Sequence, residues 1–361
     1  MSDEKRTKMV GRGATTSPAN RFEAVHLESQ FDDLEADDES LDGRRAVPTQ
    51  FLPDSSQSIF ATNDSPDISF RYSINAYRGC EHGCAYCYAR PSHEYLGMNA
   101  GLDFETKVMV KHDAPALLRA ALAKSSWQGE MITMSGVTDC YQPIERKLRL
   151  TRGLLEVMSE AQQCCGIITK NALVGRDLDI LTELGRQNLV HVHISITTLD
   201  NELCGSLEPR TSRPAARLAV VRRLAEAGVP VGVMVAPIIP GLNDHEMPAI
   251  LAAAARAGAQ HASYVLLRLP LAVEPVFRDW LATHRPDAVS RIETRIRSTR
   301  GGAMYRSGFA ERQRGRGKYA EQIKQTFQVF RAKHGLDRPL APLDTSLFRP
   351  PRPSSGQMSL F

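Results

Sequence analysis

Short runs of β-branched residues alternate with longer helical stretches along the middle of this chain, and this alternation limits the possible folds. Strands are expected at residues 72–77, 131–137, 166–170, 190–198, 230–239 and 261–269. Helices are expected at residues 148–163, 177–187, 215–227, 246–257 and 273–284. Strands that alternate with helices imply an α/β fold with a parallel sheet, whose chemistry lies at the carboxyl ends of the strands.

About six strand–helix units fit an open (β/α)6 barrel, a partial TIM barrel, better than the eight units of a closed one. A doubly wound sheet is the alternative, because periodicity alone does not separate the two architectures. The 361 residues include 42% hydrophobic and 24% charged side chains, which is typical of globular proteins. We therefore expect the barrel to occupy residues 66–285.

The two flanks differ from this core in composition. Residues 1–65 are expected to be a disordered acidic extension, because residues 28–42 hold eight acidic side chains and no basic one. Residues 286–337 are expected to form a basic helical segment, and the Pro-rich residues 338–361 a flexible tail. No apolar run approaches the ~18–20 residues of a membrane span, and the first residues lack the apolar region of a signal peptide. We expect a cytoplasmic protein without membrane contact.

Seven cysteines, an odd number, favour metal or redox use of a subset over a disulfide framework in a reducing compartment. Cys80, Cys84 and Cys87 form a C-x3-C-x2-C motif directly after the first expected strand. Three thiolates on one short loop can hold three irons of a 4Fe–4S cluster, which leaves the fourth iron free to chelate an amine and a carboxylate. The alternatives are a zinc site completed by His82 or His93, and three buried structural cysteines.

The motif C-x3-C-x-aromatic-C, with Tyr86 as the aromatic residue, resembles the signature of the radical S-adenosylmethionine (SAM) superfamily. The resemblance covers about residues 70–285, and within the superfamily the chain is similar to the spore photoproduct lyase subgroup and its uncharacterised bacterial relatives. The motifs that carry it are Tyr77-Arg78-Gly79-Cys80, Tyr86-Cys87-Tyr88, Thr138-Asp139, Thr169-Lys170, Ser195, Glu208-Pro209 and residues 233–240. The resemblance implies a radical SAM core with a 4Fe–4S cluster and SAM. It also implies reductive cleavage of SAM to methionine and a 5′-deoxyadenosyl radical that abstracts hydrogen from a substrate.

Candidate SAM contacts follow the second and third expected strands. Ser135, Thr138 and Asp139 offer hydrogen-bond acceptors for the SAM ammonium, with an ordinary strand-to-loop turn as the alternative. Lys170 is expected to bind the SAM carboxylate, because an unpaired ammonium inside a barrel mouth is costly, and the lyase has a matching lysine here.

Further candidates lie later in the chain. Ser195 matches a lyase serine beside SAM, or is a small core residue. Arg210 resembles the superfamily arginine that clamps the SAM carboxylate, or is a surface charge. Pro237 belongs to the stretch that resembles the backbone segment pairing with adenine. Glu145 either orients the loop after the second strand or is a solvated charge.

Two residues are candidates for hydrogen transfer to the substrate. Tyr88 follows the third cluster cysteine and matches the tyrosine of the hydrogen relay in the lyase. The hydrogen-donating cysteine of the lyase corresponds to Gly136 here, so Cys140 is the nearest thiol that could replace it. The alternatives for Cys140 are a substrate-pocket residue and a small buried hydrophobic residue. The remaining cysteines are expected to be structural: Cys164, Cys165 and Cys204.

A basic segment indicates DNA as the substrate. Residues 291–333 carry twelve basic and three acidic side chains, and Tyr305, Phe309 and Tyr319 lie among them. This composition suits a phosphate backbone with unstacked bases, although a solvated basic helix face or a partner for the acidic stretch would look similar. The favoured function is a radical SAM enzyme with a repair-like reaction on DNA, served by reduced flavodoxin or ferredoxin. The alternatives are an iron–sulfur redox sensor that does not turn over SAM, and a radical SAM enzyme for a peptide or small metabolite.

The last five residues, Gln357-Met358-Ser359-Leu360-Phe361, are similar to the pentapeptide by which bacterial repair and replication proteins bind the DNA polymerase sliding clamp. An extended peptide on a flexible linker can place Leu360 and Phe361 in an apolar pocket while Gln357 hydrogen-bonds at the rim. The alternative is a hydrophobic terminus that packs back on the protein.

A peptide of the last ten residues should therefore bind a bacterial sliding clamp, as measured by fluorescence polarisation. The same peptide with Leu360→Ala and Phe361→Ala should not bind, because both apolar anchors are removed. An unchanged polarisation signal with the native peptide would contradict the clamp hypothesis.

Overall fold

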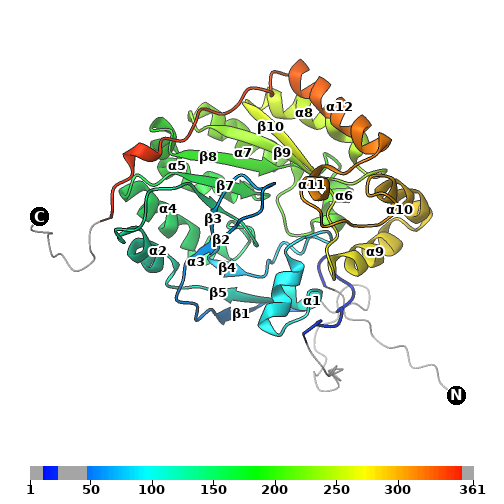
Figure 1. The fold of residues 1–361 in the computed structure, drawn as a ribbon, viewed down its shortest axis with the longest axis horizontal. Helices are drawn as coiled ribbons and strands as arrows, with labels where there is room; N and C mark the ends of the chain where they lie inside the picture. The colour runs from blue at the N-terminus through cyan, green and yellow to red at the C-terminus, as the bar shows by residue number, and fades with distance from the viewer. Residues whose placement is uncertain (1–10, 23–46, 352–361) are drawn as a thin grey trace, which may run out of the picture.

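Seven strands form the main sheet of the computed structural model, which describes residues 11–22 and 47–351 (Figure 1). Their order is β10-β9-β8-β7-β6-β3-β2. The strands are β2 (Phe60–Thr62), β3 (Tyr72–Ile74), β6 (Ile132–Met134), β7 (Cys165–Thr169), β8 (Val190–Ser195), β9 (Val231–Ile238) and β10 (His261–Leu266). The strands from β3 to β10 pair in parallel, and β2 joins the edge beside β3 in the antiparallel sense.

The six parallel strands follow one another in chain order, so each strand–helix unit adds its strand on the same side of the sheet. A doubly wound sheet would reverse its strand order at a switch point, and this sheet does not. The expected open (β/α)6 arrangement is confirmed, and the doubly wound alternative is wrong. The carboxyl ends of all six strands therefore meet at one rim.

The longer helices between the strands pack an apolar stripe against the main sheet. In α5, for example, Leu181 and Leu184 are buried. The helices between strands are α2 (Ala114–Leu122), α3 (Glu145–Leu148), α4 (Leu150–Glu160), α5 (Leu178–Arg186), α6 (Asn201–Leu207), α7 (Pro214–Glu226) and α8 (Met247–Arg256). Those after β10 are α9 (Val273–His284), α10 (Val289–Ser298), α11 (Glu311–Arg314) and α12 (Lys318–Lys333).

A small second sheet brings the N-terminal part of the chain against the core. Strands β1 (Gln50–Pro53), β5 (Lys107–Val110) and β4 (Tyr77–Arg78) lie in the order β1-β5-β4, and the short helix α1 (Leu102–Thr106) precedes β5. Residues 50–62 thus contribute two strands, unlike the disordered extension that composition predicts for residues 1–65. Strand β1 is ordered because it pairs with β5, which is distant in the sequence. The local charge pattern does not predict this pairing. The acidic residues 28–42 lie outside the described residues.

The helix α12 packs against β10, at the end of the main sheet (Figure 1). Its buried residues Ala320, Ile323 and Phe327 join the main core, and the Phe327 ring centroid lies 4.6 Å from that of Tyr264 on β10. Beside it, Arg312 of α11 forms an ion pair with Asp67, in the loop between β2 and β3. The C-terminal helices therefore connect the two edges of the open sheet.

Phe327→Ala should lower the free energy of unfolding by about 3–5 kcal/mol, because it removes a buried aromatic ring and leaves a cavity. Urea denaturation measures this change. Val329→Ala on the same helix is the control, since Val329 is exposed and its truncation should change stability by less than about 0.5 kcal/mol. Equal effects of the two variants would contradict the packing of α12 on β10.

Candidate functional site

The cysteine loop begins directly after β4 and is held in tight turns. The backbone N–H of Cys80 donates to the carbonyl of Phe104 at 2.9 Å, and the N–H of Cys87 donates to the carbonyl of Cys84 at 3.2 Å. Gly83 has φ +63°, and a Cβ there would lie 2.6 Å from the Cβ of Arg12. A glycine is required at this turn because residues 11–14 lie directly against it.

A buried ion pair holds the cysteine loop in place. Arg90 and Glu105 are fully buried, with Nη2 and Oε1 2.6 Å apart. Arg90 also donates to the carbonyl of Cys84 at 2.9 Å, and Glu105 accepts the N–H of Ala14 at 2.7 Å. The pair thus fixes both the cysteine loop and the segment that covers it. Sequence analysis missed these residues; adjacency to the cysteine motif is a signal for Arg90, whereas Glu105 has no local signal.

The three thiols share one environment that suits iron. Burial raises the pKa of Cys80 to about 12 and raises the pKa values of Cys84 and Cys87 above their ordinary value. The charge of Cys87 raises the pKa of both other thiols, so the three groups interact. Thiols with such pKa values are protonated at neutral pH and release protons when they bind a metal. This donor set fits a 4Fe–4S cluster, in which each thiolate binds a different iron.

The zinc alternative lacks a suitable fourth ligand. Among the residues that the structure describes, no three His, Cys, Asp or Glu side chains gather closely enough to hold a single metal ion. The His82 ring nitrogens lie 3.3 Å from Asn171 Nδ2 and 3.5 Å from Asp139 Oδ2. His93 donates from Nε2 to the carbonyl of Lys107 at 2.9 Å. The geometry therefore favours the cluster over mononuclear zinc.

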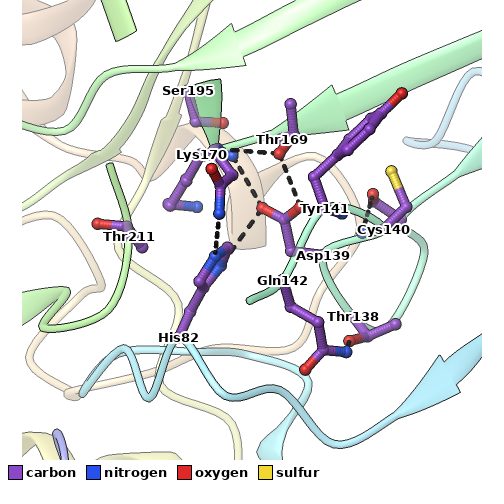
Figure 2. Close-up of polar contacts among 12 residues, drawn as sticks. His82, Thr138, Asp139, Cys140, Tyr141, Gln142, Thr169, Lys170, Ser195 and Thr211 are labelled. Carbon is purple, nitrogen blue, oxygen red and sulfur yellow. Dashed lines mark hydrogen bonds and ion pairs between the residues drawn. The ribbon is translucent and has the colours of Figure 1, made fainter. Parts of the chain in front are cut away.

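The Asp139 carboxylate connects three elements (Figure 2). Its Oδ1 accepts a hydrogen bond from Thr169 Oγ1 at 2.7 Å, and its Oδ2 accepts one from the backbone N–H of Lys170 at 2.8 Å. His82 of the cysteine loop lies beside Oδ2, and burial lowers the pKa of this histidine although Asp139 opposes the shift. Asp139 thus positions the end of β7 against the cysteine loop. Its predicted contact with SAM stays a prediction.

The other predicted residues after β6 also make internal hydrogen bonds. Thr138 Oγ1 donates to the carbonyl of Gly79 at 2.8 Å, and Ser135 Oγ accepts the N–H of Cys140 at 3.1 Å. Glu145 is fully buried, 2.8 Å from Arg176, so the idea that it is a solvated charge is wrong. These contacts shape the loop that faces the cysteines.

Lys170 is a cation without a direct counter-ion among the described residues. Its Nζ lies 5.7 Å from the ring centroid of Tyr86. Burial opposes its charge, but the carboxylate of Glu208 and the nearby Cys84 raise its pKa above the ordinary value. A charged ammonium beside the cluster cysteines is suited to bind the carboxylate of a ligand.

A buried network lies behind Tyr86. Glu208 accepts hydrogen bonds from the Tyr86 hydroxyl and from Thr197 Oγ1, and it pairs with the buried Arg217. Arg217 also donates to the carbonyl of Ser195 at 2.9 Å, which places this predicted residue at the same strand ends. Tyr86 is therefore a positioning residue here. Sequence analysis missed Arg217, although it falls on the apolar stripe of the helix expected at residues 215–227.

The structure places Arg210 and Pro237 differently with respect to the cysteine loop. Arg210 Nη1 lies 2.8 Å from Glu81 Oε1, so its guanidinium already has an anionic partner in that loop. Pro237 is buried near the end of β9, and its carbonyl accepts a hydrogen bond from Asn243 Nδ2 at 3.1 Å. The predicted roles of both residues toward SAM stay predictions.

Tyr88 and Cys140, the two candidates for hydrogen transfer, differ in exposure. Tyr88 is 47% exposed, and its hydroxyl donates to the carbonyl of Gly136 at 2.9 Å. Cys140 is 4% exposed and packs in the main core. Figure 2 shows its sulfur on the side of Asp139 away from His82 and Lys170. The three other cysteines are buried as well: Cys164, Cys165 and Cys204.

Comparison with known families agrees with this geometry. The profile of the Radical SAM superfamily matches residues 74–254, which include the cysteine loop and the strands β4 to β9. The chain belongs to the radical SAM superfamily. This membership implies a 4Fe–4S cluster and SAM as cofactors, and the expectation drawn from the cysteine motif is confirmed.

The radical SAM chain is similar to several uncharacterized proteins. Those of Mycobacterium bovis and Mycobacterium tuberculosis are 39% identical over 226 residues, which are 62% of this chain and 66% of the relatives. One of Methanocaldococcus jannaschii is 31% identical over 176 residues, 49% of this chain and 63% of that protein. The matched part thus spans less than two thirds of each relative.

Solved structures of spore photoproduct lyase share the fold. The lyase complexed with dinucleoside spore photoproduct has a TM-score of 0.58 and 19% identity, covering 79% of each chain. A lyase variant with bound AdoMet and the same dinucleoside has a TM-score of 0.55 and 20% identity, covering 81% of this chain and 80% of the other.

In the described part of the radical SAM chain, no helix has the length and hydropathy of a membrane span.

Cys84→Ala should lose the brown colour and bound iron of the anaerobically reconstituted protein, because it removes one of three cluster ligands. Cys164→Ala should keep both, since this buried thiol donates to the carbonyl of Gly129 at 3.7 Å, away from the loop. Visible absorption and iron and sulfide quantification measure the difference. Loss of iron from both variants would show that the ligand assignment is wrong.

Proposed function

We propose that this radical SAM enzyme cleaves SAM reductively and abstracts hydrogen from a nucleic acid in a repair-like reaction. The observation that carries the proposal is the Lys170 ammonium, which lies near Cys84 and Tyr86 of the cysteine loop and has no direct counter-ion among the described residues. When bound, the reduced cluster supplies the electron that breaks a C–S bond of SAM, so that hydrogen can be abstracted from the substrate.

The residues of the chain then bind and orient the cofactors. Lys170 holds the carboxylate of SAM, and the buried Glu208–Arg217 pair keeps Tyr86 and the cysteine loop in place. Asp139 fixes the end of β7, from which Lys170 extends, against that loop. Because Glu208, Arg217 and Asp139 are already hydrogen-bonded, the surroundings of Lys170 are preorganised.

Tyr88 is the residue that we propose for hydrogen transfer. Its hydroxyl rests on the carbonyl of Gly136, and almost half of its surface is exposed, so a substrate can reach the ring. Cys140 is less suited to this role, because its thiol is buried in the core. Similarity in fold to the lyase bound to a dinucleoside photoproduct supports a related substrate.

The basic C-terminal helices support a nucleic acid over a peptide or small metabolite. Of the aromatic residues in this segment, Phe309 is 57% exposed, whereas Tyr319 hydrogen-bonds to Asp244. Reduced flavodoxin or ferredoxin is the proposed electron donor. The proposed clamp-binding residues Gln357, Leu360 and Phe361 lie outside the described residues.

Anaerobic reconstitution with iron, sulfide and dithionite, followed by an assay for 5′-deoxyadenosine, tests the central proposal. Formation of 5′-deoxyadenosine that increases with a damaged oligonucleotide supports it. A reduced cluster that forms no 5′-deoxyadenosine under any condition would instead support the redox sensor.

Lys170→Met should weaken SAM binding by about 10-fold or more, because it removes a charge-assisted hydrogen bond to the carboxylate. Arg210→Gln is the matched control and should have a smaller effect, since Arg210 is already paired with Glu81. SAM titration followed by EPR of the reduced cluster measures both. A larger effect of Arg210→Gln would assign the carboxylate to Arg210.

A further inference from the structure

Arg268 lies at the end of β10 with no anionic partner. Its guanidinium makes no hydrogen bond or ion pair with the described residues, and its buried Nε has no partner. The guanidinium carbon lies 5.0 Å from the ring centroid of Tyr88. A cation without an acidic partner among the described residues therefore contacts Tyr88, the residue proposed for hydrogen transfer.

A second arginine lies close to Arg268 and is also uncompensated. Arg300 is 1% exposed and donates to the carbonyl of Leu267 at 2.6 Å and to the carbonyl of Glu311. Its Nε has no partner, and no described carboxylate lies within ion-pair distance. Burial, together with the charge of Arg268, lowers the pKa of Arg300 to about 10, which leaves it protonated at neutral pH.

Two more guanidinium groups adjoin the turn that follows Arg300. Arg306 Nε donates to the carbonyl of Arg300 at 2.8 Å. The Arg316 guanidinium lies so close to Gly301 that a Cβ there would be 2.2 Å from its Nη2. Arg316 is 3.6 Å from the carboxylate of Glu311, whose charge also acts on Arg300, so one carboxylate adjoins two of the four cations. The turn therefore carries an excess of positive charge.

This arrangement suits a phosphate group. A buried cation without an anion is costly, and an anionic ligand would offset that cost. A guanidinium presents a planar fork of donors that matches two phosphate oxygens, and the free Nη groups of Arg268 offer such a fork. Tyr88 beside it supplies an aromatic surface for an unstacked base.

We propose that Arg268 binds a phosphate group of the substrate and thereby seats the reacting nucleotide against Tyr88. Arg300 acts as a positioning residue that holds the end of β10 and adds positive charge behind Arg268. The proposal rests on the proposed function, because it assigns the substrate of the same site. The phosphate belongs either to a nucleic acid backbone or to a free nucleotide.

A second basic surface is the rival location. A cavity of about 700 Å³ lies between β10 and α12, and its lining includes Arg314, Lys318 and Lys324. Arg316 also lines this cavity, whereas neither Tyr88 nor Arg268 does. Arg268 is the stronger candidate because it contacts Tyr88 directly.

The test compares binding of a fluorescein-labelled single-stranded hexathymidylate by the reconstituted holoenzyme and its variants. Arg268→Gln should weaken binding by about 10-fold and reduce the salt slope by about 0.7, the loss of one phosphate contact to a single strand. Arg268→Lys should recover part of the affinity, because it keeps the charge but not the fork. Lys324→Gln in the rival cavity removes the same charge and should weaken binding less than Arg268→Gln does.

Two further binding measurements identify the ligand. Replacing the phosphodiesters of the probe by uncharged methylphosphonates should weaken wild-type binding by a larger factor than binding by Arg268→Gln, because the variant has already lost one phosphate contact. Competition by thymidine 5′-monophosphate that depends on Arg268 and matches the oligonucleotide in affinity would assign the site to a free nucleotide. Weak competition would assign it to a nucleic acid backbone.

Unchanged hexathymidylate binding by Arg268→Gln would overturn the proposal, as would an equal or larger loss with Lys324→Gln. A thermal unfolding midpoint equal to that of the wild type excludes a folding defect in each variant. The titration needs no SAM cleavage, so an inactive wild type would contradict the proposed function and leave this test intact. Normal 5′-deoxyadenosine formation with unaltered binding would contradict only the phosphate site.

Discussion

The geometry of the site depends on the hydrogen bonds that the carboxylate of Asp139 accepts. It joins the loop after β6 to the end of β7 and lies against a histidine of the cysteine loop. Hydrogen bonds to a carboxylate are stronger than those between neutral groups, so one side chain can hold three separate segments in register. The hydrogen bond from the Lys170 N–H to Asp139 fixes the direction in which Lys170 leaves β7.

Two buried ion pairs support the site, whereas three cations beside it lack an acidic partner among the described residues. Arg90 pairs with Glu105 and Arg217 pairs with Glu208, and these four side chains are almost completely buried. Breaking such a pair costs about 3–5 kcal/mol, because it leaves an uncompensated charge. Lys170, Arg268 and Arg300 lack such partners among the described residues. All three lie at the carboxyl ends of strands or in the turn beside them, where a ligand can supply the missing anion.

The sequence predicts the barrel and the cofactors well because both depend on local patterns. The hydrophobic period, the strand lengths and the cysteine spacing can each be recognised in short stretches of sequence. The structure has all six expected strands. The pairing of β1 with β5 and of Arg210 with Glu81 joins residues far apart in the chain, which no local pattern reveals. Arg217 is intermediate, since a charge on an apolar stripe signals a buried partner but does not name it. For Cys140, sequence proximity to Asp139 gives no information on the direction of the thiol.

The ion pair between Asp67 and Arg312 connects the two edges of the open sheet. A closed barrel would join its first and last strands by backbone hydrogen bonds, and widening it would break a whole ladder. Here the gap beside β10 is spanned by side chains of α11, with Arg312 and Gln313 reaching Asp67 and its carbonyl. Separating the two edges therefore costs a few polar contacts at the surface and leaves every strand pairing intact. A sheet whose edges are joined in this way can therefore widen without losing its strand order.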